Sequence, residues 1–123
     1  MKFLCLCHYD ARQFAALGPA DFAEIGAICA PHDKALKDSG HLLLVGSLAM
    51  PDQYRTLRAD QKGVTVEDGP YASTSEPFGA FFIIEAASLD EATEIARLHP
   101  GTHLGGRMRG GIEIRPIDFF EQP

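Results

Sequence analysis

Three segments of this chain are apolar on both faces of the strand that each predicts, and this feature limits the fold more than any other. Successive strand residues point to opposite sides of a sheet. In segment 2–9, Phe3 alternates with Leu4, and segments 41–48 and 80–86 are similarly apolar on both faces. A sheet built from these segments therefore has to be covered on both sides.

A long helix is predicted between the first two strands. It begins at Gly18-Pro19, where proline suits the first helical position, and ends at Gly40. Apolar residues recur within it every three or four positions. Because Pro31 removes one helix hydrogen bond, we expect a kink or a break near Ala30.

A second helix begins at Ser88, which forms a capping box with Glu91. Alternation predicts further strands at 63–67 and 112–117, and residues 50–60 are expected to be a connection that can include a short helical turn. The resulting order is βαβ-ββ-αβ. This order predicts an α+β, ferredoxin-like fold with an antiparallel sheet and one additional strand.

Two helices can cover only one face of such a sheet. The simplest cover for the face without helices is the corresponding face of a second copy. We therefore expect a homodimer with sheets packed ~10 Å apart. A length of 123 residues fits one domain over 1–123, and no repeat or boundary is visible.

Composition excludes several classes of function. A net charge of −6 repels a phosphate backbone, so we expect no binding to nucleic acid. No apolar run approaches the ~18 residues that span a membrane, and none resembles a secretory signal. With three cysteines, an odd count, we expect free thiols and a cytoplasmic protein.

Neither a metal nor an organic cofactor is expected. His99 and His103 have a helical ligand spacing, but the Pro-Gly pair between them ends the helix. In a strand, Cys5 and Cys7 share one face while His8 points to the other. No phosphate-binding or dinucleotide-binding motif occurs.

The candidate catalytic residues are His99, His32 and Asp68. His99 ends the second helix, whose dipole favours imidazolium and a raised pKa; it is either a helix cap or a general acid or base. His32 lies on the apolar stripe of the first helix, as a core residue or as a partner of His99. Asp68 is the nearest plausible carboxylate to orient them.

The polar loop after Asp68 is either a solvated turn or part of a site. Its candidate substrate-binding residues are Tyr71, Thr74 and Glu76. Arg107 and Arg109 lie in a glycine-rich segment before the last strand. We expect them to hold an anionic group of a ligand.

The chain resembles the YCII-related proteins of the DGPF type over essentially its whole length. The residues that carry the resemblance are Asp68-Gly69-Pro70-Tyr71-Ala72 with Thr74 and Glu76, Gly79-Ala80-Phe81-Phe82-Ile83-Ile84-Glu85-Ala86, Ser88-Leu89-Asp90-Glu91-Ala92, Ala96-Arg97 with His99-Pro100, and Gly111-Ile112-Glu113-Ile114-Arg115-Pro116-Ile117. The resemblance implies a dimeric α+β barrel with a small pocket in each protomer. It implies no settled activity, although one branch of the family is a dehydrochlorinase.

The resemblance also implies a histidine on the first helix facing an aspartate at the end of the second. In this chain the position of the histidine falls at Cys29, with His32 one turn later. The position of the aspartate falls at His99. The pair in this chain is therefore expected to be Cys29 or His32 facing His99. Two functions are predicted: a cofactor-independent lyase or isomerase that moves a proton on a small aromatic or carboxylate substrate, or a non-catalytic ligand-binding or accessory module.

Overall fold

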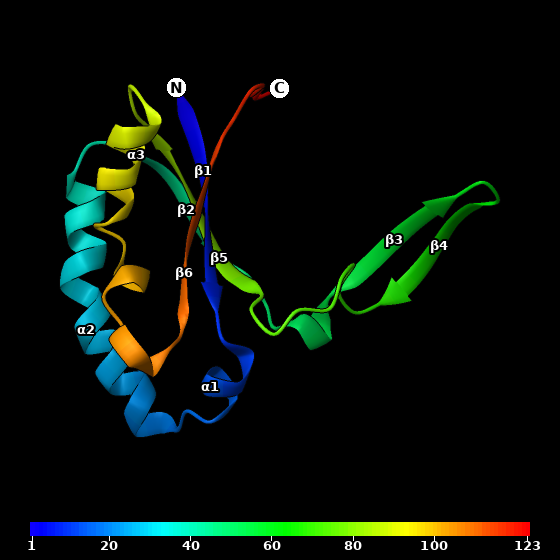
Figure 1. The fold of residues 1–123 in the computed structure, drawn as a ribbon, viewed down its shortest axis with the longest axis horizontal. Helices are drawn as coiled ribbons and strands as arrows, with labels where there is room; N and C mark the ends of the chain where they lie inside the picture. Colours follow the sequence, from blue (N-terminus) through cyan, green and yellow to red (C-terminus); the bar gives the residue numbers. More distant parts are fainter.

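The computed structural model describes residues 1–123 and contains one four-stranded antiparallel sheet with the strand order β2-β5-β1-β6. One long and one short helix, joined to the strands by crossover connections, lie on the same face of this sheet (Figure 1). The main elements are β1 (Lys2–Tyr9), α2 (Pro19–Asp38), β2 (Leu42–Ser47), β5 (Phe78–Glu85), α3 (Leu89–Ala96) and β6 (Gly110–Pro116). The expected α+β, ferredoxin-like fold is confirmed.

The core lies between the sheet and the helices. Phe3 of β1 and Phe82 and Ile84 of β5 are fully buried there. Leu36 is the one buried residue of α2, and the small side chains Ala92 and Ala96 let α3 approach the sheet closely. Ser88 caps α3 by accepting a hydrogen bond from the Glu91 N–H, as the sequence predicts.

The prediction of a break near Ala30 is wrong, because α2 runs without interruption from Pro19 to Asp38. Pro31 is exposed, and so is Ala27, the residue whose carbonyl loses its helical donor. Water can reach that carbonyl on the outer side of the helix. The missing bond therefore does not have to be replaced by a change in backbone path.

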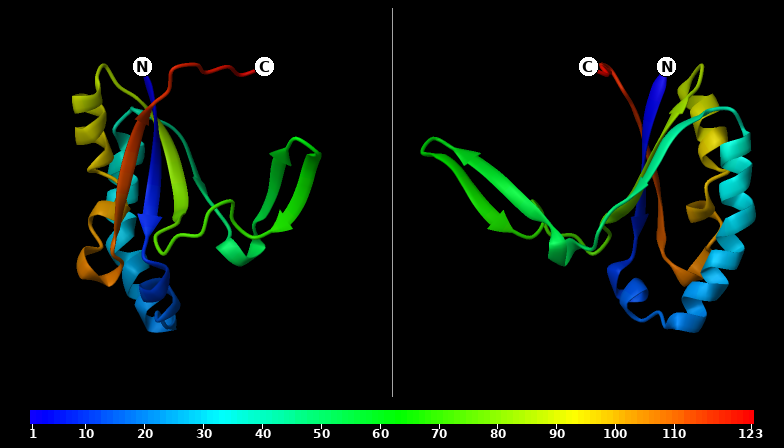
Figure 2. Two further views of the ribbon diagram at one scale, coloured as in Figure 1. Left: turned by 45° about the vertical axis from the view of Figure 1, so that its right-hand side comes forward. Right: turned by 180° about the vertical axis from the view of Figure 1, so that it is seen from behind.

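For residues 50–60, where a connection with a short helical turn is expected, the turn is present but the residues after it form a strand. After a short 3₁₀ turn at Pro51–Gln53, the chain forms β3 (Arg55–Asp60), which pairs with β4 (Gly63–Asp68). The strand expected at 63–67 therefore exists, but it belongs to a separate two-stranded sheet. We call this hairpin, residues 55–68, the arm; it projects away from the body in every view (Figures 1 and 2).

The second face of the main sheet carries no helix (Figure 2). Phe81 and Ile83 point to this side, because the residues that alternate with them along β5 are in the core. On β2, Gly46 leaves room for Phe81: a Cβ there would lie 2.6 Å from the aromatic ring. None of the helices is long and apolar enough to cross a membrane.

Replacing Leu36 by alanine tests whether α2 is held to the sheet through this one side chain. Leu36 is 2% exposed, so the Leu36→Ala variant is expected to lower the free energy of unfolding by about 2–5 kcal/mol. Leu43→Ala is the matched control, because Leu43 is 49% exposed and its loss should cost about 0.5 kcal/mol. Equal losses in urea unfolding would contradict this packing.

Candidate functional site

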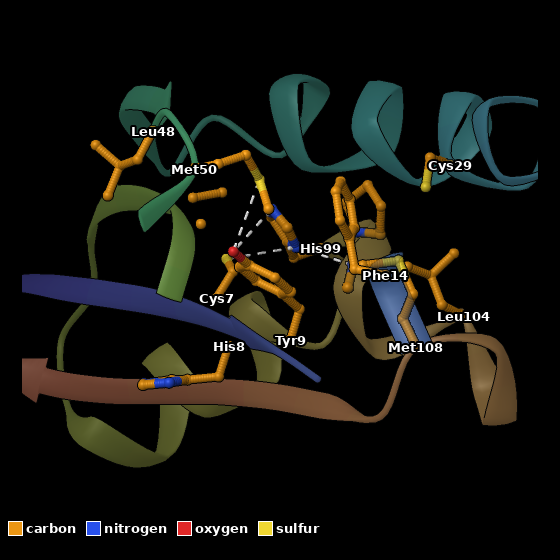
Figure 3. Close-up of a pocket in the computed structure, with 14 residues that line it drawn as sticks. Cys7, His8, Tyr9, Phe14, Cys29, Leu48, Met50, His99, Leu104 and Met108 are labelled. Carbon is orange, nitrogen blue, oxygen red and sulfur yellow. Dashed lines mark hydrogen bonds between the residues drawn. The ribbon is translucent and has the colours of Figure 1, made fainter. Parts of the chain in front are cut away.

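A cavity of about 250 Å³ lies at the end of the main sheet, on the side that the helices cover. Figure 3 shows the side chains around it: Cys7 and Tyr9 come from β1, Cys29 from α2, and His99 from the segment that follows α3. The short helix α1 (Ala11–Ala15), which the sequence does not predict, supplies Phe14. We call this space the inner cavity.

His99 is the most constrained polar group of the inner cavity. The backbone N–H of Gly101 donates a hydrogen bond to its Nδ1 over 2.9 Å. The ring also stacks on Phe82, with centroids 4.7 Å apart and planes 3° apart. Because Nδ1 accepts a hydrogen bond, the proton of the neutral ring lies on Nε2, which makes Nε2–H a donor.

Burial lowers the pKa of His99, and the nearby Asp33 carboxylate opposes this shift only in part. The sequence-based expectation of a raised pKa is therefore wrong. The expectation assumed a helix that reaches His99, whereas α3 ends at Ala96. The hydrogen bond from Gly101 also disfavours a second proton on the ring, since Nδ1 cannot hold that proton and accept the bond together.

The thiols around the inner cavity are in their neutral form. Burial raises the pKa of Cys7 to about 12, and its Sγ lies 3.7 Å from His99 Nε2. Burial, together with the charge of Asp33, also raises the pKa of Cys29. Because the thiolate is the nucleophile, neither cysteine is equipped for covalent catalysis at neutral pH.

Tyr9 supplies the other hydroxyl group near the cavity. Burial, followed by the proximity of Tyr54, raises its pKa, so the phenol keeps its proton. The hydroxyl donates only a long, weak hydrogen bond to the sulfur of Met50, over 3.8 Å. A ligand oxygen could replace this thioether at little cost.

No charged side chain lines the inner cavity, and nine of its fourteen lining residues are hydrophobic. The polar groups near its centre are neutral donors. Such a space disfavours an anionic ligand, because a buried charge needs a partner. It is larger than the ~150 Å³ cavity that accommodates benzene in another protein, so it can hold one substituted ring.

The structure separates most of the site residues that the sequence predicts. Of these, His99 lines the inner cavity together with Cys29, one of its two expected partners. His32 stacks instead on His103, with ring centroids 3.6 Å apart. Asp68 lies on the arm, where it pairs with Arg55 over 3.1 Å.

Tyr71, Thr74 and Glu76 do come together, but around a different space. This outer cavity, of about 480 Å³, lies between the open sheet face and the base of the arm. Both cavities are lined by His8 and Leu48. His8 is bound through Nδ1 to the Glu76 carbonyl, over 2.8 Å.

The two predicted arginines belong to neither cavity. Arg107 forms a bidentate ion pair with Glu24 of α2, with one N–O distance of 2.7 Å. Arg109 uses its backbone N–H to bind the side chain of Gln13. Arg107 is thus occupied within the protein, and the pair ties the glycine-rich segment to α2.

Sequence reasoning missed Cys7 and Tyr9 as site residues because an apolar strand face indicates core. The alternation did place both residues on one face of segment 2–9. Nothing in the sequence showed that the last residues of this face line a cavity beyond the core. No group of three or more His, Cys, Asp or Glu side chains is placed to hold a metal ion.

The four-stranded antiparallel sheet with helices on one face defines an α+β fold, and a half-open cavity lies at the end of its sheet. The model of the YCII-related domain matches residues 1–120, and the chain belongs to this family. The chain is 28% identical to an uncharacterised protein of Rhizobium meliloti, over 98% of this chain and 95% of that protein.

Among solved structures, the chain is similar to 5-chloro-2-hydroxyhydroquinone dehydrochlorinase from Burkholderia phenoliruptrix, in complex with 2,5-dihydroxybenzoquinone. The two are 19% identical with a TM-score of 0.46, and the match covers 96% of this chain and 94% of the other. A likeness at this level says nothing about the substrate or activity of this chain.

The lowered pKa of His99 predicts how stability depends on pH. The unfolded state takes up the proton near pH 6.5, more readily than the folded state, so the free energy of unfolding decreases as the pH falls below ~6.5. The loss continues until the pH passes the folded-state pKa. His99→Phe keeps a ring over Phe82 but has no proton to gain, so this variant should lose less stability between pH 7 and pH 5. Parallel curves for the two proteins would contradict the assignment.

Raised thiol pKa values predict slow alkylation. Iodoacetamide should modify Cys7 far more slowly at pH 7.5 than it modifies a free thiol of ordinary pKa, about 8.5. The rate, followed by mass spectrometry, should still be rising with pH at pH 10. A plateau below pH 9 would show a thiolate in the cavity.

Proposed function

We propose that the inner cavity binds a small, uncharged aromatic molecule that carries a hydrogen-bond-accepting oxygen. The observation that supports this most strongly is the hydrogen bond from Gly101 to His99 Nδ1, since it fixes Nε2–H as a donor in an apolar space. The partner of Nε2 in the structure is the Cys7 Sγ at 3.7 Å, a weak acceptor that a ligand oxygen can replace. The ligand's oxygen accepts from Nε2–H, and its ring packs among Phe14, Leu104 and the sulfur atoms of the lining.

In this proposal the chemistry is proton transfer without a cofactor, of the lyase or isomerase type, in which the carbon-bound proton passes to a water molecule that enters the half-open cavity. A neutral imidazole N–H aimed at a carbonyl oxygen stabilises the negative charge that develops there when a neighbouring carbon loses a proton. His99 therefore polarises the substrate as a donor. It is poorly suited to remove the proton itself, because its one free lone pair is already bound to Gly101.

The second candidate function is ligand binding without catalysis. No carboxylate lines the inner cavity, and the raised pKa values of Cys7 and Tyr9 keep both groups protonated. The cavity therefore offers donors but no strong base. If no water molecule in the cavity takes up the proton, the cavity only holds the substrate.

Acetophenone and benzoate form a matched pair of probes, one a neutral ring with an acceptor oxygen and the other an anion of similar size. Acetophenone should bind more tightly than benzoate in calorimetric titration at pH 7.5. His99→Phe should weaken acetophenone about tenfold, the equivalent of one hydrogen bond, while leaving benzoate unaffected. Tighter binding of benzoate would contradict the proposal.

The exchange of acetophenone methyl protons in D₂O separates the two candidate functions. An enzyme that stabilises the enolate should accelerate this exchange, followed by NMR, and His99→Phe should remove most of the acceleration. Binding without accelerated exchange would favour the ligand-binding module.

We also propose that the protein is a homodimer in which the open sheet faces of two copies lie together. This proposal is supported by the helices, which pack on one side of the sheet only. The apolar side chains of Leu4, Phe81 and Ile83 lie on the other side and are not fully buried. A second copy offers an identical, self-complementary surface.

A further inference from the structure

The arm is an amphipathic hairpin whose apolar face is uncovered. Leu57 pairs with Val66, and Ala59 with Val64, so all four side chains share one face. Leu57 is 67% exposed, Val64 64% and Val66 62%. Hairpins that alternate in this way normally bury their apolar face.

The opposite face of the arm is polar and satisfied by its own contacts. Arg58 pairs with Glu67 over 3.1 Å. Its guanidinium also lies 4.4 Å from the ring centre of Tyr71 and donates to the Tyr71 carbonyl over 2.8 Å. This face needs no further partner, so any partner of the arm faces the apolar side.

The Asp-Gly-Pro-Tyr motif fixes the base of the arm. Gly69 adopts a positive φ of 107°, and its N–H donates to the Tyr54 carbonyl over 2.7 Å. The Thr56 hydroxyl donates to the Gly69 carbonyl over 2.8 Å, and Asp68 pairs with Arg55. The strongest motif of the sequence thus acts as a brace, which closes the two strands of the arm at their base.

A braced, apolar hairpin in water is unusual. A lone two-stranded hairpin is marginally stable, and an exposed apolar patch generally marks an interaction site. Fixing the arm before binding reduces the entropy that is lost when a partner docks. These properties indicate a binding element rather than a loose insertion.

The size and shape of the surface favour a second copy of this chain as the partner. A stable interface buries ~800 Å² on each side, over twenty or more residues. Two strands of six residues are too few, so the arm alone cannot form such an interface and the open face of the main sheet has to belong to it. The arm and the main sheet enclose a concave angle (Figures 1 and 2), and residues of both line the outer cavity. A second copy can therefore dock in this angle.

We propose that the arm of each copy packs its apolar face on the open-sheet side of a second copy, and so closes the partner's outer cavity. This inference rests on the proposed homodimer but adds a separate contact to it. The partner's Leu57 and Val66 then form part of the wall of a space that Tyr71 and Arg115 line in this chain.

Three variants test the arm by sedimentation equilibrium at micromolar concentration. Leu57→Asp with Val66→Asp places charge on the apolar face. Thr65→Asp places charge on the polar face as the matched control, and Leu44→Asp changes the open sheet face. The wild type and the control should be dimers of about twice 13.4 kDa. The arm variant should dissociate at least tenfold more readily, with an unchanged circular dichroism spectrum.

A fourth variant tests the brace without touching the apolar face. Tyr71→Ala removes the ring under Arg58 and should weaken the dimer, whereas Tyr71→Phe keeps the ring and should not.

The outcomes separate the two proposals. If the arm variant stays as dimeric as the wild type while Leu44→Asp dissociates, the dimer stands and the role of the arm is wrong. A monomeric wild type would overturn both. Equal dissociation of the arm variant and Thr65→Asp would show a general charge effect and would also overturn the role of the arm.

Discussion

A four-stranded sheet has two faces, and this chain provides helices for one of them. The core, the inner cavity and the apolar open surface follow from this constraint. On the covered side, Phe3, Phe82 and Leu36 form a small core. The helices do not fill that side completely, and the inner cavity is the space left at the end of the sheet. The open side keeps an apolar surface that one copy of the chain cannot bury.

Backbone geometry determines the chemistry of the inner cavity. His99 has a titratable ring, yet the Gly101 N–H and the surrounding burial hold it neutral with the proton on Nε2. Two cysteines and a tyrosine, which are potential nucleophiles or bases, are also kept protonated by burial. In the proposed function, a space of this kind recognises shape and one acceptor oxygen. It is the opposite of the charged, anion-holding site that Arg107 and Arg109 suggest in the sequence.

Much of the fold could be predicted from the sequence, because the strongest signals are local. The alternation in 2–9 and the Ser88 cap both correspond to observed elements. The strand at 55–60 was missed because its sequence, Arg-Thr-Leu-Arg-Ala-Asp, has too few apolar residues to indicate a strand. The apolar residues that pair with this strand belong to β4. A pattern that is read within one segment cannot include them.

The site was harder to predict, since it depends on contacts between distant segments. Cys7 meets His99 across 92 positions, and Arg107 meets Glu24 across 83. Sequence reasoning found His99 from its place at a helix end, but it assigned the wrong sign to the pKa shift. The direction depends on burial and on one backbone N–H, which only the folded chain reveals.

The tautomer of His99 is the most direct test of this account. Long-range ¹⁵N–¹H correlation spectra of the imidazole rings distinguish neutral Nε2–H, neutral Nδ1–H and imidazolium forms. At pH 7 the account predicts that His99 is neutral, with its proton on Nε2 and Nδ1 accepting a hydrogen bond. A proton on Nδ1, or an imidazolium ring at that pH, would contradict the proposed donor and the preference for an uncharged ligand that follows from it.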